Sequence, residues 1–213
     1  MSTLSTPAPT PAQTRITVVI LAGGANTRMH GQPKALLDWN GQPFIAHIIN
    51  ALHAQAATLA ISTQRPDLFA AYRLPTLADP FADAHGPLAG MLAGLNFAQT
   101  EFTLFVPCDN PLISPVLAER LLAELIAHDK DIAFAQTGAD RHYLYAIMRS
   151  HLKADLRDYF VRGDFSVHRW YATKSAIAVS FDDQPRCFSN INTAAALDAL
   201  NAAALPSDDS RGQ

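Results

Sequence analysis

The sequence predicts a three-layer α/β fold in which helices cover both faces of a mostly parallel sheet. Strand and helix patterns alternate from residue 15 to about residue 130, as expected for right-handed βαβ crossovers. The apolar run Ile16–Leu21 indicates a strand buried on both faces. Residues with distinctive chemistry follow three expected strands, at Gly23–Gly24, Asp79 and Cys108–Asp109. Because ligands bind beyond the carboxyl ends of parallel strands, this agreement predicts a binding site there.

The length of 213 residues and the hydrophobic content of 49% are enough for a substantial core. We expect residues 15–204 to form a single domain, because no internal repeat or linker interrupts them. Residues 1–14, rich in Pro, Ser and Thr, are expected to be a disordered N-terminal tail, and residues 205–213 a C-terminal tail.

The first half of the domain alternates strands with amphipathic helices. Phe44 follows Pro43, which is tolerated in a first helical turn, and opens a helical stripe that ends near Leu52. A second stripe runs from Leu88 to Leu95. Strands are expected at residues 16–21, 58–62, 74–78 and 102–107, and a short helix at residues 67–72.

The second half continues the pattern. We expect Ser114 to cap a helix that starts at Pro115, and Thr193 to cap a final helix that ends near Ala204. Another helix follows Ser150. Strands are expected at residues 131–135, 143–148 and 176–181, and the core side of the helix after Ser114 is expected to comprise Val116, Leu117, Leu121, Leu125 and Ile126.

Composition excludes several classes of function. A net charge of -3 and a pI near 6.2 provide no basic field for nucleic acid or an anionic membrane. The N-terminus lacks the pattern of a signal peptide, and no apolar run approaches the length of a membrane span. Cys108 and Cys187 suggest neither a disulfide framework nor a CxxC site, and the histidines lack zinc-site spacing. We therefore expect a cytoplasmic protein.

A basic segment, residues 141–174, contains seven Lys and Arg residues against three Asp. Such a segment is consistent with an anionic ligand and equally with solvated helix faces. The sequence leaves both interpretations open.

The loop after the first strand indicates a phosphate site. The spacings GxxxxGK[ST] and GxGxxG are absent, which argues against a P-loop hydrolase and a dinucleotide-dependent dehydrogenase. What remains is LAGG-x3-R-M-x-G-x-P-K. Its glycines let backbone amides approach phosphate oxygens. Arg28 can bridge two such oxygens, and Lys34 supplies a compact charge, so we expect a nucleoside triphosphate there.

The chain resembles the molybdenum cofactor guanylyltransferase (MobA-type) family of nucleotidyltransferases, which have a Rossmann-like nucleotidyltransferase fold. The matching segments extend over almost the whole expected domain. They are Leu21-Ala22-Gly23-Gly24 with Arg28-Met29 and Lys34; Asp79; Gly86-Pro87-Leu88-Ala89-Gly90; Pro107-Cys108-Asp109-Asn110-Pro111; and Asn190-Ile191-Asn192-Thr193.

The resemblance implies transfer of GMP from GTP to the terminal phosphate of a molybdopterin-type cofactor, with Mg²⁺ as cofactor and pyrophosphate as leaving group. Molybdoenzymes or cofactor-delivery proteins would be further partners. The implied catalytic residues are Arg28, Lys34 and Asp109, with Asp109 as the metal ligand. The implied nucleotide-binding residues are Leu21, Ala22, Gly23, Gly24, Lys34, Asp79 and Asp109, and the implied cofactor-binding residues are Asn190 and Asn192.

The expected reaction needs no dedicated base. The second pKa of a phosphate monoester is near ~6, so the acceptor is already a dianionic nucleophile at neutral pH. Catalysis should then depend on positioning and on neutralising charge with Mg²⁺ at Asp109 and with Arg28 and Lys34. Cys108 has no paired histidine and is expected to be a packing residue.

Several alternatives stay open. Asp79 can contact guanine or ribose, or cap the element that follows it, and a nucleotide contact at Ser62–Thr63 is undecided. Cytidylyl transfer to the same cofactor and nucleotidyl transfer to a sugar-1-phosphate are the rival reactions. A catalytically silent nucleotide-binding regulator is the rival of a different class.

Overall fold

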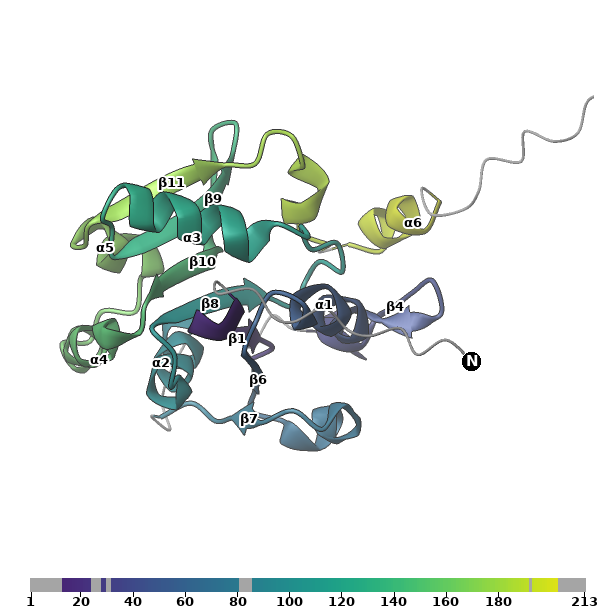
Figure 1. Ribbon diagram of the computed structural model, residues 1–213. Coiled ribbons are helices and arrows are strands. Elements are labelled where there is room, and N and C mark those ends of the chain that lie inside the picture. Colours follow the sequence, from purple (N-terminus) through teal and green to yellow (C-terminus); the bar gives the residue numbers. More distant parts are fainter. Residues whose placement is uncertain (1–12, 24–27, 30–31, 81–85, 192, 203–213) are drawn as a thin grey trace, which may run out of the picture.

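The computed structural model describes residues 13–23, 28–29, 32–80, 86–191 and 193–202 (Figure 1). The expected tails therefore lie largely outside the described residues. The described strands are β1 (Ile16–Leu21), β2 (Arg28–Met29), β3 (Gln32–Pro33), β4 (Asp38–Trp39), β5 (Gln42–Pro43), β6 (Thr58–Ser62), β7 (Thr76–Leu77), β8 (Phe102–Pro107), β9 (Ile132–Thr137), β10 (Asp140–Arg149) and β11 (Ala176–Ser180). The α-helices are α1 (Phe44–His53), α2 (Pro87–Phe97), α3 (Leu117–Ala127), α4 (Lys153–Val161), α5 (Val167–Ala172) and α6 (Ala194–Ala202). Short 3-10 helices are η1 (Gln13–Arg15), η2 (Lys34–Leu36), η3 (Pro66–Tyr72), η4 (Ser150–Leu152) and η5 (Pro185–Phe188).

Seven strands form one sheet in the order β11-β9-β10-β8-β1-β6-β7. β1 lies between β8 and β6 and is parallel to both. β10 is antiparallel to both of its neighbours, whereas the other pairs are parallel. This is the mostly parallel α/β sheet that the sequence predicted.

Helices cover both faces of the sheet and make three layers. The apolar side chains of α1 and α3 pack on one face, against alternate residues of the strands. Those of α2, α4 and α5 pack on the other face, where Trp170 is fully buried. The two faces of β8 belong to different clusters, since Val106 joins the α1 and α3 side and Phe105 the α2 side.

A third, smaller cluster lies beyond the end of the sheet. Leu37 and Phe44 pack there against Ile191 and Leu200. In Figure 1, α6 accordingly lies beside the β4–β5 hairpin and apart from the sheet. The last described helix therefore packs on the segment that follows the glycine-rich loop.

Several predicted elements need correction. β9 covers Ile132–Thr137 instead of residues 131–135, β10 covers Asp140–Arg149 instead of residues 143–148, and β11 ends at Ser180 instead of residue 181. The third strand is only Thr76–Leu77 instead of residues 74–78, in keeping with its edge position after Pro75, which has no N–H to donate. The helix after Ser114 begins at Leu117, because Ser114 forms a turn whose Oγ accepts from the N–H of Val116. Ile126 in its last turn is 47% exposed and does not face the core.

The cap predicted for the final helix is confirmed. The Oγ1 of Thr193 accepts from the N–H of Ala196 at 3.1 Å. The helix is described as far as Ala202, and residue 204 lies beyond the described part. Across the described ranges, no helix combines the length and apolarity that crossing a bilayer requires.

Candidate active site

The carboxyl ends of four parallel strands lie side by side. Leu21 of β1 pairs with Ser62 of β6 and with Pro107 of β8, and Ser62 pairs with Leu77 of β7. The residues that follow these strands must therefore emerge at one edge of the sheet. This edge, called the carboxyl edge below, receives the segments that carry Gly23, Asp79 and Asp109.

Gly23 leaves room at the carboxyl edge. A Cβ added to it would meet no atom within 4 Å of the described structure, and its φ is not in the left-handed region. The backbone before it is fixed, because the N–H of Ala22 donates to the carbonyl of Ser62 at 2.8 Å. The backbone at Gly23 is thus anchored on one side and borders space that the described residues leave unfilled. Gly24 lies outside the described residues.

Lys34 reaches the site through a small hairpin. In this hairpin, β2 pairs with β3 so that Arg28 lies opposite Pro33, the residue before Lys34. The pairing brings the backbone of the expected phosphate-binding arginine next to that of the expected lysine. The N–H of Leu37 then donates to the carbonyl of Lys34 at 3.1 Å and closes the η2 turn.

Asp109 is a half-buried carboxylate close to Lys34. Burial raises the pKa of its carboxyl group, and the positive charge of Lys34 opposes that rise. Its Oδ1 atom is buried and accepts no hydrogen bond from the described residues. A buried carboxylate oxygen without a partner is costly unless a cation or donor completes it. The charges of Lys34 and Asp109 thus interact, while the roles predicted for the two residues stay predictions.

The donor chemistry of Asp109 fits a magnesium ion. Mg²⁺ prefers oxygen ligands and is usually bound through one or two carboxylates together with substrate phosphates. No group of three or more His, Cys, Asp or Glu side chains that could hold a metal occurs within the described ranges. A single carboxylate beside Lys34 matches the magnesium pattern better than that of zinc or calcium.

The start of α2 also lies at the carboxyl edge. Gly86 has φ +85°, a conformation that favours glycine, and Pro87 follows it as the first helical residue. One turn later, a Cβ at Gly90 would come within 2.6 Å of Ser62 Oγ and 3.1 Å of Leu21 Cδ2. The motif 86–90 therefore lets α2 pack closely on the ends of β1 and β6.

Asp79 is held by a residue that sequence reasoning missed. The Nε2 of Gln64 donates to its Oδ2 at 2.6 Å, and both side chains reach the surface. Asp79 does not cap α2, whose N-cap is Gly86. By contrast, Ser62 is buried, and Thr63 Oγ1 accepts from the backbone N–H of Arg65. Gln64, a polar residue two positions after β6, is thus the better nucleotide-binding candidate.

The C-terminal segment closes onto the loop after β8. The N–H of Ile191 donates to the carbonyl of Asp109 at 3.1 Å. The fully buried Asn110 donates through Nδ2 to the carbonyl of Arg186 at 2.9 Å. These bonds bring the exposed Asn190 next to Asp109 along the chain path, whereas Asn192 lies outside the described residues.

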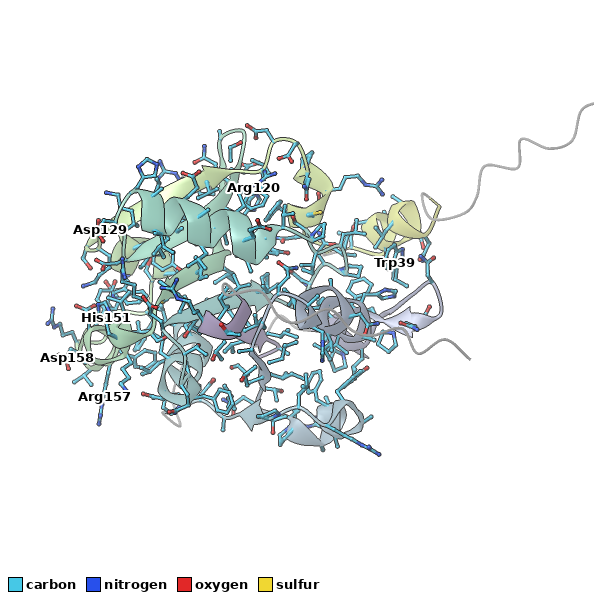
Figure 2. All side chains as sticks on the ribbon, in the orientation of Figure 1. Trp39, Arg120, Asp129, His151, Arg157 and Asp158 are labelled. Carbon is cyan, nitrogen blue, oxygen red and sulfur yellow. The ribbon has the colours of Figure 1, made fainter. Side chains whose placement is uncertain are left out.

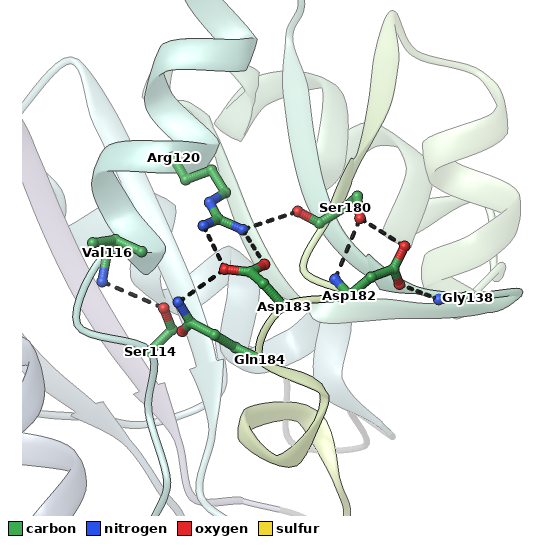
Figure 3. Close-up of polar contacts among 8 residues, drawn as sticks. All are labelled: Ser114, Val116, Arg120, Gly138, Ser180, Asp182, Asp183 and Gln184. Carbon is green, nitrogen blue, oxygen red and sulfur yellow. Dashed lines mark hydrogen bonds and ion pairs between the residues drawn. The ribbon is translucent and has the colours of Figure 1, made fainter.

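An ion pair anchors the start of this segment to α3 (Figure 3). Arg120 makes a bidentate pair with Asp183, at 2.6 and 2.9 Å, and also donates to the carbonyl of Ser180. Its guanidinium lies 4.6 Å from the ring centroid of Phe181. These contacts hold the turn between β11 and η5.

Two other residues near the site, Cys108 and His142, also have side chains that could take part in chemistry. Burial raises the pKa of the Cys108 thiol to about 12, so the thiol is neutral at physiological pH and unsuited to nucleophilic attack. His142 stacks on Phe188 with ring centroids 5.1 Å apart, and its Nε2 lies 2.7 Å from Thr137 Oγ1. Both residues therefore have packing roles.

The basic segment 141–174 does not gather at the carboxyl edge. Arg149, Arg169 and Lys174 pair with Asp129, Asp164 and Asp155, respectively. Figure 2 shows Arg157 on α4, at the opposite side of the molecule from Trp39 in the β4–β5 hairpin. This placement favours solvated helix faces over an anionic ligand.

The described residues thus place Gly23, Lys34 and the half-buried Asp109 at one edge of a mostly parallel sheet. The family model described as "MobA-like NTP transferase domain" matches residues 18–179. A molybdenum cofactor guanylyltransferase of Vibrio cholerae is 37% identical over 175 residues, which cover 82% of this chain and 86% of the relative. One of Shewanella loihica is 34% identical over 180 residues, covering 84% and 92%. The chain therefore belongs to the MobA-like nucleotidyltransferase family and is related to its molybdenum cofactor guanylyltransferases.

Solved structures with the same fold include proteins of different specificity. Molybdopterin-guanine dinucleotide biosynthesis protein A from Archaeoglobus fulgidus has a TM-score of 0.74 at 19% identity, covering 88% of this chain and 97% of that chain. A CMP:2-keto-3-deoxy-manno-octonic acid synthetase complexed with CTP has a TM-score of 0.66 at 15% identity, covering 89% and 98%. The fold is thus shared by enzymes that use different nucleotides and does not by itself select GTP.

Proposed function

We propose that this protein transfers GMP from GTP to the terminal phosphate of a molybdopterin-type cofactor and releases pyrophosphate. The observation that carries the proposal is Asp109, a buried carboxylate with an unpartnered oxygen beside Lys34 at the carboxyl edge. A protein that only binds nucleotide has no need for such a group next to the phosphates. The choice of GTP rests on the curated names of the relatives and on the motif 86–90.

The nucleotide would lie over the ends of β1, β6 and β7. Gly23 offers its backbone to the phosphates in a space that no side chain of the described residues fills. The neighbouring pair of Gln64 and Asp79 provides both a donor and an acceptor for nucleoside hydroxyls or the guanine edge. Of the remaining expected residues, Leu21 and Ala22 contribute backbone, and Gly24 and Arg28 complete the phosphate loop.

Charge neutralisation would dominate the chemistry. Lys34 balances the triphosphate, and Asp109 provides an oxygen ligand for Mg²⁺, which would supply charge stabilisation between two anionic reactants. The acceptor phosphate attacks without a base, because it is already mostly dianionic at neutral pH. Asn190 and Asn192 would orient the acceptor from the segment that closes on the Asp109 loop.

Reconstitution tests the proposal directly. Purified protein, Mg-GTP and molybdopterin are added to a cofactor-free molybdoenzyme, and we expect GTP-dependent activation with pyrophosphate release. Replacing GTP with CTP should remove the activation. Activation by CTP alone would identify a cytidylyltransferase, and GTP binding without pyrophosphate release would identify a regulator.

Nucleotide binding gives a second test that needs no acceptor. Thermal unfolding is measured with GTP or CTP, with and without Mg²⁺, and we expect the largest stabilisation from Mg-GTP. Lys34→Ala should weaken binding of GTP more than binding of guanosine, because it removes a charge that faces the phosphates. Equal losses for both ligands would contradict a phosphate-binding role.

A further inference from the structure

Three buried side-chain polar atoms lack a hydrogen-bond partner in the described part of the chain. They are Trp39 Nε1, Asp109 Oδ1 and Tyr145 Oη. Native proteins contain few such atoms, and each one calls for an explanation. Two of the three, those of Asp109 and Tyr145, lie in one region of the fold.

Strand pairing places Tyr145 beside the loop that carries Asp109. β10 runs antiparallel to β8 and their pairing ends with Ala146 opposite Phe105, so Tyr145 lies where β8 continues toward Asp109. Tyr145 and Cys108 belong to the same buried cluster. The electrostatics agree, because burial first and then the negative charge of Asp109 raise the pKa of Tyr145.

The ring of Tyr145 packs against neighbouring side chains, whereas its hydroxyl has no hydrogen-bond partner among the described residues. The ring packs edge-on against Phe188 at 5.0 Å between centroids, and the side chain is 3% exposed. A phenylalanine would make the same apolar contacts without burying a hydroxyl. Tyr171, also 3% exposed, differs because its hydroxyl donates to the carbonyl of Tyr143 at 3.0 Å.

We infer that Tyr145 is a positioning residue for Asp109, whose Oδ1 accepts a hydrogen bond from the Tyr145 hydroxyl, directly or through one water molecule, when the other carboxylate oxygen binds the cation. Such a bond would satisfy both unpartnered atoms and fix the orientation of the carboxylate. Outer partners of metal-binding carboxylates commonly have this role. The inference rests on the proposed function, since it requires a cation at Asp109.

The test compares Tyr145→Phe with the matched control Tyr171→Phe. Each removes one hydroxyl from an equally buried tyrosine, but among the described residues only the Tyr171 hydroxyl has a partner. For both variants and the wild type, the measurements are the Tm without ligands, the affinity for Mn²⁺ in the presence of GTP by electron paramagnetic resonance, and kcat with molybdopterin.

The two variants should show opposite behaviour. Tyr145→Phe should keep or raise the Tm, bind Mn²⁺ about 10- to 100-fold more weakly and lower kcat by a similar factor. Tyr171→Phe should lower the Tm and keep the wild-type Mn²⁺ affinity. Unchanged Mn²⁺ affinity in Tyr145→Phe, or equal losses in both variants, would overturn the role of Tyr145 while leaving the proposed function intact. A wild-type protein that binds no Mn²⁺ with GTP would overturn both.

Discussion

At the carboxyl group of Asp109, the stability of the apo fold conflicts with the proposed binding of a cation. Burial raises its pKa, so the charged form is disfavoured in the absence of ligand. Its buried Oδ1 also has no hydrogen-bond donor among the described residues, which adds to the cost of the charged form. Residues that serve a site at the expense of stability are common in enzymes.

Asp109→Asn separates these two effects. Near pH 7 the amide removes a buried charge at nearly constant shape, so we expect the apo protein to unfold at a higher temperature. The rate of GMP transfer should fall by more than about 100-fold, beyond the loss typical of an outer-shell change. Calorimetry and pyrophosphate release measure the two effects. A variant with nearly normal turnover would disprove the metal-binding role.

Gly23→Ala tests the open space at the glycine loop. The φ of this position is outside the left-handed region and an added Cβ meets no atom of the described residues within 4 Å, so the apo protein should be stabilised by about 0.4–1 kcal/mol. The added methyl group would occupy the space proposed for the phosphates, and we expect the Kd for GTP to rise at least about tenfold. Unchanged GTP affinity, measured by calorimetric titration, would place the nucleotide elsewhere.

At the scale of elements, α2 is fitted to the sheet through two glycines with different neighbours. A Cβ at Gly94 would lie 2.7 Å from Phe105 Cε1 and 2.8 Å from Val19 Cγ2, in the middle of the sheet. A Cβ at Gly90 would clash mainly with Ser62 Oγ at the carboxyl edge. The part of α2 that carries Gly90 therefore packs at the carboxyl edge, whereas the part that carries Gly94 packs against the middle of the sheet.

Substitution of the two glycines should have separable results. Gly94→Ala should cost about 1–3 kcal/mol from overpacking, partly offset by about 1 kcal/mol of helix propensity, and should leave GTP affinity unchanged. Gly90→Ala should reduce stability and GTP affinity together. Adding Ser62→Ala removes the clashing hydroxyl, so the double variant should recover both properties. Failure of that rescue would show that Ser62 is not the limiting contact.

At the scale of the whole molecule, the stability of the fold in acid depends on carboxyl groups whose pKa values are shifted in opposite directions. The hydrogen bonds from Arg120 hold the pKa of Asp183 down to about 2. A carboxyl group with a lowered pKa stabilises the fold above its unfolded value of about 3.9, and the stabilisation is lost as the pH falls through the lowered value. Asp109, whose pKa is raised, instead destabilises the apo fold above its unfolded value.

Urea unfolding at pH 7 and pH 3 tests these signs with one type of substitution. Asp183→Asn should lower stability at pH 7 and weaken the dependence of stability on pH between about 4 and 2. Asp109→Asn should raise stability at pH 7. Shifts of the same sign in both variants would contradict the assignment of either carboxyl group.

The sequence allowed the prediction of those parts of the molecule that local patterns determine. β1, β6 and β8 have the predicted bounds, because buried parallel strands are continuous apolar runs between turn residues. The β2–β3 and β4–β5 hairpins were missed, since strands of two residues have no periodicity. The hydrogen bonds of Ile191 to Asp109 and of Asn110 to Arg186 could not be predicted either, because they join segments that are distant in the chain.

Those same two hydrogen bonds set an order of events during synthesis. The strands β1, β6 and β8 and the loop that carries Asp109 leave the ribosome before residues 186–191, which complete that loop. Until they arrive, the carbonyl of Asp109 and the buried amide of Asn110 have no protein partner from this segment. A nascent chain would thus contain β1, β6 and β8 before the loop that carries Asp109 is held in place, so we expect activity to appear only after residues 186–191 have emerged.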